Sequence, residues 1–157
     1  MHEMYENDSA AYFKEPAWHG LGNVIKDPMS TKDALEKAEL DWQVDKSPIE
    51  AYTSDGHRAS GGNHRAVVRR DTRQILGVVS KNYKVMQNYD AFHIADALGS
   101  EVTVESAGSV RNGANVYLLL RGDSFDAHNN NDTVEQYLAL FWGHDGSMSF
   151  TALPTSL

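Results

Sequence analysis

The chain has 157 residues, 41% of them hydrophobic, which suffices for one ordinary core and predicts a single domain. Its formal charge of −8 excludes a protein that coats nucleic acid with its whole surface and allows only a localised anion site. Because there is no cysteine, disulfides, thiolate metal sites and cysteine nucleophiles are excluded. The N-terminus shows no signal-peptide pattern, and no apolar run approaches the roughly 20 residues of a membrane helix, so we expect a soluble, cytoplasmic protein.

The first part of the chain has little periodicity before a short helix. Residues 1–15 are predicted to form a flexible arm, and the single domain then occupies residues 16–157. The two glycines that follow Trp18 favour a tight turn that packs this side chain against the core. A helix is predicted over residues 31–40, because a capping hydroxyl precedes a small apolar face.

The next segment is predicted to be a hairpin that follows a loop. A short extended piece at residues 49–52 ends in a turn, and the glycine-rich residues 57–63 are predicted to be a flexible loop. Two β-branched runs, residues 66–70 and 75–79, are separated by four polar residues, which is typical of a β-hairpin.

A second helix is predicted over residues 89–98. Asn88 is the expected N-cap, and Gly99 follows the last helical residue. Phe92, Ala95 and Leu98 recur at helical spacing and are expected to form the buried stripe.

The rest of the chain reads as strands. Runs at residues 102–110 and 114–121 flank an Asn-Gly pair, the strongest short-range hairpin signal. A polar connector is predicted at residues 124–133, followed by strands at residues 134–142 and 148–152.

Together these elements predict an α+β fold, with a mainly antiparallel sheet of six or seven strands in hairpins and two helices. Residues 116–120 are apolar at every position and are expected to form a central strand. The sequence stops directly after a predicted strand, which indicates that the natural protein continues.

Positive charge is concentrated in residues 64–84. This segment has six Lys and Arg and one acid, Asp71, whereas the remaining chain has 8 cations and 21 acids. Such segregation is what an anion-binding surface requires, because field strength depends on local charge. The alternative is a solvated hairpin whose arginines pair with acids elsewhere.

For nucleic acid, cations that follow the backbone combine with aromatic side chains that stack on bases. A tyrosine lies between two lysines at the end of the basic segment, although it could instead pack in the core. The candidate nucleic-acid-binding residues are Arg65, Arg69, Arg70, Arg73, Lys81, Tyr83 and Lys84.

A second candidate is a functional turn formed by His144, Asp145 and Ser147. Neighbours in sequence do not easily converge on one reacting atom, so the alternative is a hairpin turn in which Asp and Ser satisfy backbone donors. We assign no catalytic residue, cofactor or resident metal from the sequence.

Several short motifs carry a family resemblance. They are Trp18-His19-Gly20-Leu21-Gly22, Ser80-Lys81-Asn82-Tyr83 followed by Gln87-Asn88, Glu105-Ser106-Ala107-Gly108, and His144-Asp145-Gly146-Ser147 followed by Pro154-Thr155. On these motifs the chain resembles the phage/plasmid-like proteins of the domain of unknown function 932 family. Members are usually about twice as long, so the resemblance implies an N-terminal half or a short form. It also implies a bacterial host cell and a setting among recombination and anti-restriction genes.

Three hypotheses follow. The first is a nucleic-acid-binding protein, an oligomeric single-strand DNA binder or annealing factor in mobile-element replication or recombination. The second is a non-catalytic interaction protein whose acidic surface binds or inhibits a host factor. The third is a metal-dependent hydrolase centred on His19, His144 and Asp145. The basic segment favours the first, and a binding protein over an enzyme.

Overall fold

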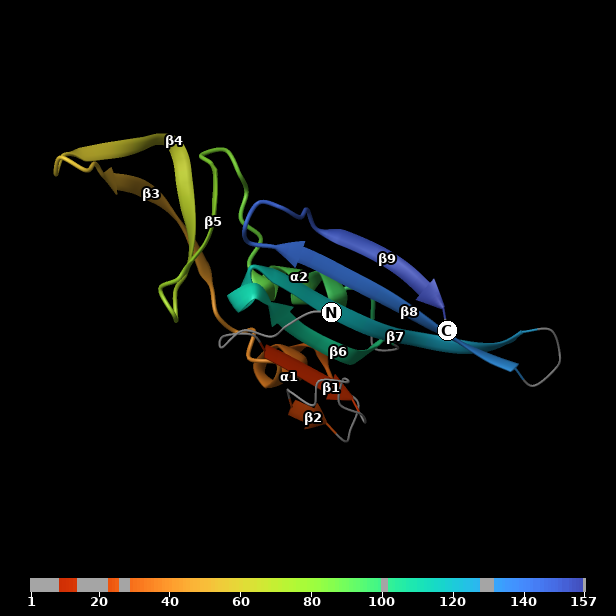
Figure 1. Ribbon diagram of the computed structural model, residues 1–157. Coiled ribbons are helices and arrows are strands. Elements are labelled where there is room, and N and C mark those ends of the chain that lie inside the picture. Colours follow the sequence, from red (N-terminus) through yellow and green to blue (C-terminus); the bar gives the residue numbers. More distant parts are fainter. Residues whose placement is uncertain (1–8, 14–22, 26–28, 100–101, 128–131, 157) are drawn as a thin grey trace.

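The computed structural model describes residues 9–13, 23–25, 29–99, 102–127 and 132–156. In these ranges the strands are β1 (Ser9–Phe13), β2 (Asn23–Ile25), β3 (Val44–Tyr52), β4 (Arg58–Arg69), β5 (Ile75–Ser80), β6 (Thr103–Val110), β7 (Asn115–Ala127), β8 (Asp132–Gly143) and β9 (Thr151–Ser156). The α-helices are α1 (Thr31–Lys37) and α2 (Asn88–Asp96). The predicted α+β class with two helices is confirmed, but the strands form two sheets instead of one (Figure 1).

The larger sheet forms the body of the protein. Its six strands are ordered β2-β1-β6-β7-β8-β9, and every neighbouring pair is antiparallel except β1 and β2. The run predicted to be central lies in β7, which pairs with β6 on one side and β8 on the other. The hairpin predicted around Asn112-Gly113 is confirmed, with a short 3-10 turn at Arg111–Gly113.

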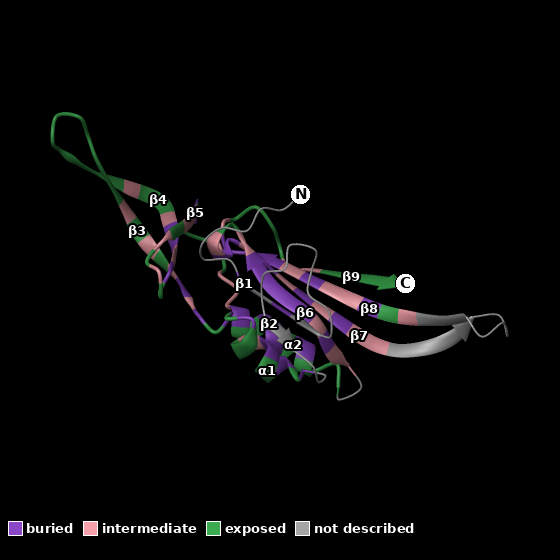
Figure 2. Ribbon diagram, turned by 60° about the horizontal axis from the view of Figure 1, so that its bottom comes forward, coloured by how far each residue is buried: buried purple, intermediate pink, exposed green. Residues whose placement is uncertain are grey.

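The helices pack against one face of this sheet, and the side chains of β7 alternate between buried and half-buried. In β7, Val116, Leu118 and Leu120 are buried, and in β8 Trp142 is buried beside Phe92 of α2, with their ring centroids 6.1 Å apart. Figure 2 marks buried residues on both helices and on strands of the larger sheet. The side chains between them point to the other face, which no described helix covers.

The smaller sheet, in the order β3-β4-β5, projects from the body as an arm (Figure 1). Opposite the single residue Ile49, β4 carries the four residues 61–64, and β4 bends sharply at this irregularity. Gly61 is required there, because a Cβ atom would lie 2.7 Å from the Cβ of Ile49. We refer to this bend as the elbow.

Several predicted boundaries are wrong. Residues 57–63 are not a flexible loop: from Arg58 on they belong to β4, because β3 supplies backbone partners that a polar sequence does not reveal. The polar connector at residues 124–133 is also wrong where it is described, since β7 continues to Ala127 and β8 begins at Asp132. Within the predicted arm of residues 1–15, Ser9–Phe13 forms β1 and pairs with β6.

Other differences concern the helices and the last strand. Gln87, rather than Asn88, is the N-cap of α2, and Leu98 is 48% exposed instead of buried because the helix ends at Asp96. Helix α1 ends three residues before the predicted end at Leu40. The last strand covers Thr151–Ser156, and the expected turn around Trp18 lies outside the described residues.

Candidate nucleic-acid interface

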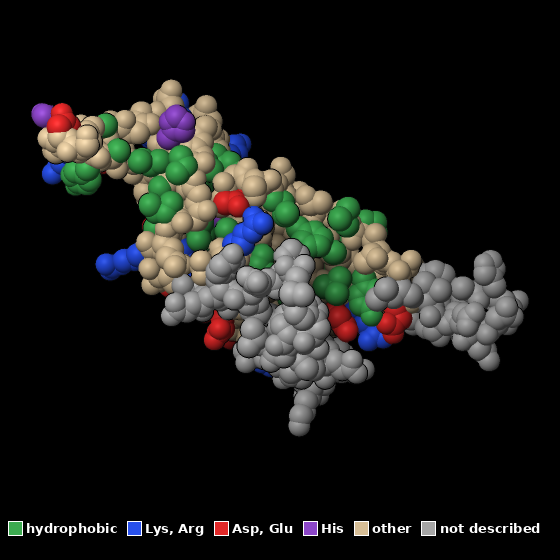
Figure 3. Space-filling view, in the orientation of Figure 1, with side chains coloured by type: hydrophobic (Ala, Val, Ile, Leu, Met, Phe, Trp, Pro, Cys, Tyr) green, Lys and Arg blue, Asp and Glu red, His purple; other side chains and the backbone are tan. Residues whose placement is uncertain are grey.

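The arm is the most basic part of the protein. Residues 44–84 carry 8 of the 14 Lys and Arg but only 4 of the 22 Asp and Glu. Figure 3 shows Lys and Arg side chains projecting from several points along it. Because the electrostatic potential follows local charge, the arm is positive on a protein whose net charge is −8.

Four cations lie on the segments that meet at or directly beside the elbow, and we call them the elbow cluster: Lys46, Arg65, Lys81 and Lys84. The three lysines are exposed and the arginine is half-buried. Lys46 Nζ donates to the carbonyl oxygens of Lys81 (2.6 Å) and Tyr83 (2.8 Å), so the segment after β5 is held against β3. Within the described residues none of the four forms an ion pair, so their charge stays available to an external anion.

Arg69 was predicted to contact phosphate, but it is part of the core. Its side chain is 7% exposed, and its Nε donates to the Asp71 carboxylate at 2.7 Å. Its Nη1 donates to the Asn112 carbonyl at 2.9 Å, and its guanidinium lies 4.2 Å from the centroid of the Trp42 ring. Partial burial raises the pKa of Asp71, but the hydrogen bond and charge of Arg69 outweigh it and leave the pKa below its usual value. Arg69 therefore joins the arm to the body.

The other two arginines of the hairpin differ in environment. Arg70 is exposed, but its Nε donates to Asp45 at 2.7 Å. This agrees with the alternative that the arginines of a solvated hairpin pair with acids elsewhere in the chain. Arg73 is exposed at the turn in a left-handed backbone conformation, with φ of 60°. It lies at the end of the β4–β5 hairpin away from the elbow, so it is not part of the elbow cluster.

Tyr83 is half-buried and packs against the core instead of standing free for stacking. Its hydroxyl donates to the carbonyl of Gly143 at 3.2 Å. Partial burial, and then the charge of Asp145, raise the pKa of this hydroxyl. Tyr83 therefore connects the part of the arm nearest the body to the end of β8. This agrees with the alternative that the tyrosine packs in the core.

The junction between arm and body is centred on a buried polar cluster. His144 is 1% exposed, and its Nε2 lies 2.8 Å from Asn88 Oδ1, which also accepts from Trp142 Nε1 at 2.9 Å. Asn88 Nδ2 donates to the Leu40 carbonyl at 3.0 Å, so the amide oxygen must be the shared acceptor and His144 Nε2 the donor. The Trp42 ring packs edge-on against His144, with centroids 5.3 Å apart.

The three residues of the predicted functional turn therefore lie in two different environments. His144 lies in the core, whereas Asp145 Oδ1 accepts from the backbone N (2.9 Å) and Oγ (2.6 Å) of Ser147. This is the arrangement expected for a hairpin turn in which Asp and Ser satisfy backbone donors. No three His, Asp or Glu side chains within the described ranges are placed to hold a metal ion, and His19 lies outside those ranges.

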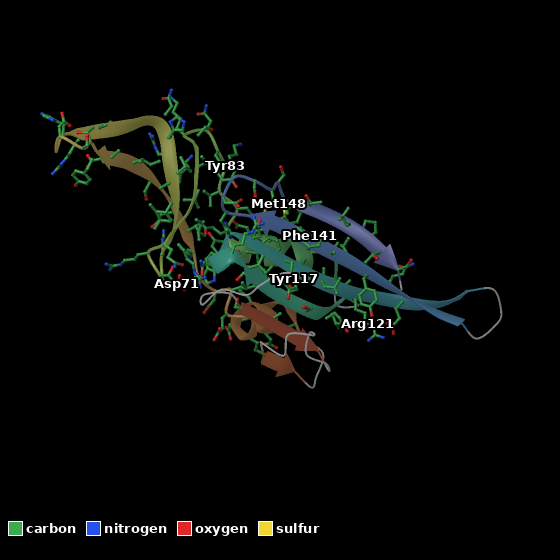
Figure 4. All side chains as sticks on the ribbon, viewed as in Figure 1. Asp71, Tyr83, Tyr117, Arg121, Phe141 and Met148 are labelled. Carbon is green, nitrogen blue, oxygen red and sulfur yellow. The ribbon has the colours of Figure 1, made fainter. Side chains whose placement is uncertain are left out.

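The face of the larger sheet that no described helix covers, called the open face below, carries a pocket that the sequence did not indicate. It has a volume of about 400 Å³. Tyr117 and Phe141, which lie directly opposite each other on β7 and β8, form its apolar part with Met148. Arg111 and Ser147 lie at its rim. Figure 4 shows that Tyr83, Met148, Phe141 and Tyr117 lead from the base of the arm onto this face.

Sequence reasoning missed these aromatic residues because the two faces of an apolar strand look alike. The run at residues 116–120 is apolar throughout, and only the position of the helices decides that Tyr117 lies on the open face. Lys46 was missed because it lies far in sequence from the basic segment and reaches the elbow through β3–β4 pairing.

Comparison with known proteins gives one match. The profile of a family described as a domain of unknown function (DUF932) matches residues 75–157, more than half of the chain. The chain belongs to the DUF932 family. The match begins at β5 and covers strands β6 to β9 of the larger sheet, together with the residues that line the pocket. No curated protein and no solved structure matches this DUF932 chain. None of its helices in the described ranges is long and apolar enough to cross a membrane.

Proposed function

We propose that this DUF932 protein binds single-stranded nucleic acid, with DNA as the favoured ligand, and acts in the replication or recombination of a mobile element. One observation carries the proposal: a projecting arm holds 8 of the 14 cations, and an elbow cluster on it presents four of them without ion pairs among the described residues. Several unpaired cations close to one another are suited to binding the phosphates of a nucleic-acid backbone.

The rest of the molecule supports a localised site of binding. Outside residues 44–84 acids outnumber cations by 18 to 6, so the body repels the phosphate backbone that the arm attracts. A single nucleic-acid strand is therefore expected to lie along the arm and on the part of the body next to it, instead of wrapping the whole body. We expect this binding to require no catalysis and no cofactor.

The test compares two charge reversals of equal size. Lys81→Glu with Lys84→Glu alters the elbow cluster, and Lys32→Glu with Lys37→Glu alters two exposed lysines of α1 on the body. Binding to a labelled single-stranded oligonucleotide is measured by fluorescence anisotropy at several salt concentrations. Only the elbow variant should weaken binding, and the slope of log K against log salt should decrease by about 0.7 for each phosphate that the variant no longer neutralises.

Two outcomes would overturn the proposal. One is the absence of binding by the wild-type protein even at low salt. The other is an equal effect of the two charge reversals, which would show that net charge and not the elbow cluster controls binding. Arg69 is not used in this test, because reversal of a buried charge would disturb folding.

A further inference from the structure

We infer that the pocket beside the arm holds one unstacked base of the single strand whose phosphates lie on the elbow cluster. The inference rests on the proposed function and names what the same surface does with the bases. It starts from the pair Tyr117 and Phe141, which are register partners on adjacent strands and are both half-buried on the open face.

The chemistry of the pocket fits a nucleobase. Two aromatic rings and the Met148 side chain offer flat, polarisable surface for a planar ring. Arg111 and Asn115 place a cation and an amide around them, which suit a phosphate or the polar edge of a base. The Ser147 hydroxyl donates to Asp145 and can still accept a hydrogen bond from a base. A volume of about 400 Å³ lies within the range of small-ligand sites, about 300–1,000 Å³.

The rim of the pocket is held in place by the arm. Arg111 and Asn112 both have left-handed backbone angles, with φ of 54° and 60°, and the Asn112 carbonyl accepts from Arg69 of β4 at 2.9 Å. The Arg111 side chain is exposed and makes no ion pair within the described residues. A buried arginine of the arm thus fixes the turn that presents an exposed arginine to the pocket.

The opposite wall is also continuous with the arm. Ser147 and Met148 follow Asp145, whose backbone is packed directly on Gly77 of β5. Tyr83, beside Lys84 of the elbow cluster, bonds to Gly143 at the end of β8. A nucleic-acid strand that continues from the elbow cluster toward the body therefore reaches the pocket next (Figure 4). Because bases are stacked and paired in a duplex, only a single strand can fill the pocket without unstacking.

The experiment measures binding of an oligothymidylate and of an abasic oligonucleotide of equal length. Wild-type protein should bind the oligothymidylate more tightly. Phe141→Leu, which keeps apolar bulk but removes the ring, should weaken that binding roughly 5- to 100-fold, the effect expected when one base no longer stacks on an aromatic side chain. It should leave abasic binding and the salt slope unchanged. Leu153→Ala, on the same face of β9 but outside the pocket, is the control and should change neither.

The outcomes show whether the inference fails alone or together with the proposed function. Equal binding of the two oligonucleotides, or an unchanged affinity in Phe141→Leu, would overturn the base pocket while elbow-dependent binding could stand. Loss of all binding by wild type would overturn both. Thymidine monophosphate is the third probe: if it binds as tightly as the oligonucleotide and ignores the elbow variant, the pocket serves a free nucleotide and the inference fails. Arg111→Gln, on the exposed rim, gives a second variant that does not disturb the core.

Discussion

Gly77 of β5 and Asp145 of the turn after β8 touch through their backbones: a Cβ atom on Gly77 would lie 2.5 Å from the Cα of Asp145 and 2.7 Å from its carbonyl oxygen. No L side chain fits between them, because both neighbouring atoms belong to the main chain. This close approach, together with the Tyr83–Gly143 hydrogen bond, brings the arm and the wall of the pocket together.

Gly77→Ala is expected to loosen this junction. The methyl group must displace the turn, and overpacking of this kind costs about 1–3 kcal/mol. Urea denaturation measures the change in the free energy of unfolding. Gly122→Ala is the matched control, because its nearest neighbour would be at an ordinary 3.7 Å. If the two variants unfold alike, the close approach of Gly77 to Asp145 is not a feature of the folded protein.

Arg69→Met is expected to destabilise the protein although it keeps the length of the side chain. It removes the bonds to Asp71 and to the Asn112 carbonyl, and the cation–π interaction with Trp42. A decrease in stability of about 2–3 kcal/mol is expected for charged hydrogen bonds in a buried site. Arg70→Met removes an exposed pair with Asp45 and should cost about 1 kcal/mol or less. Equal destabilisation in the two variants would contradict the structural role of Arg69.

His144 should make stability depend on pH. Burial, and to a lesser extent the charge of Arg69, lower its pKa to about 4, while the charge of Asp145 opposes them. The unfolded chain takes up a proton near the ordinary pKa of about 6.5, so between these values the unfolded state binds more protons and stability falls as the pH falls. With about 1.4 kcal/mol for each pKa unit, the decrease in stability from pH 7 to pH 4 is on the order of 3 kcal/mol.

His144→Gln is the variant that isolates this effect, because its amide nitrogen can donate to Asn88 Oδ1 and does not titrate. Denaturation at a series of pH values should give a flatter profile for His144→Gln than for wild type. Parallel profiles would show that His144 is not the group responsible.

Tyr137 should ionise only at high pH. Its hydroxyl donates to Glu135 at 2.6 Å, and this bond, followed by burial and the charge of Glu105, raises its pKa to about 12. The stability that this bond contributes is present below pH 10 and disappears as the pH rises through about 12. Glu135→Gln removes the charged acceptor and should lower the pKa of Tyr137. The pKa is measured from the part of the phenolate absorbance that is missing in Tyr137→Phe, since the chain has seven tyrosines. An unshifted titration in Glu135→Gln would refute the assignment.

Much of the local structure could be predicted from the sequence. Asn112-Gly113 between two apolar runs identified a hairpin, because few residues adopt left-handed angles readily. Ser30 at the start of α1 accepts from the backbone of Asp33, as a capping hydroxyl should. The concentration of cations in residues 64–84 was visible as well, since charge is a property of composition.

Which charges and rings are exposed and which are buried was decided by the tertiary structure. Arg69 and Lys81 are both cations of the basic segment at residues 64–84. The first is nevertheless buried against Trp42, and the second is exposed at the elbow. Tyr83 was a candidate for stacking and packs at the junction, while Tyr117 and Phe141 meet on the open face through pairing of residues 24 apart. The physical reason is that the side chains of a strand alternate between faces, and only long-range packing of helices and arm determines which face is closed.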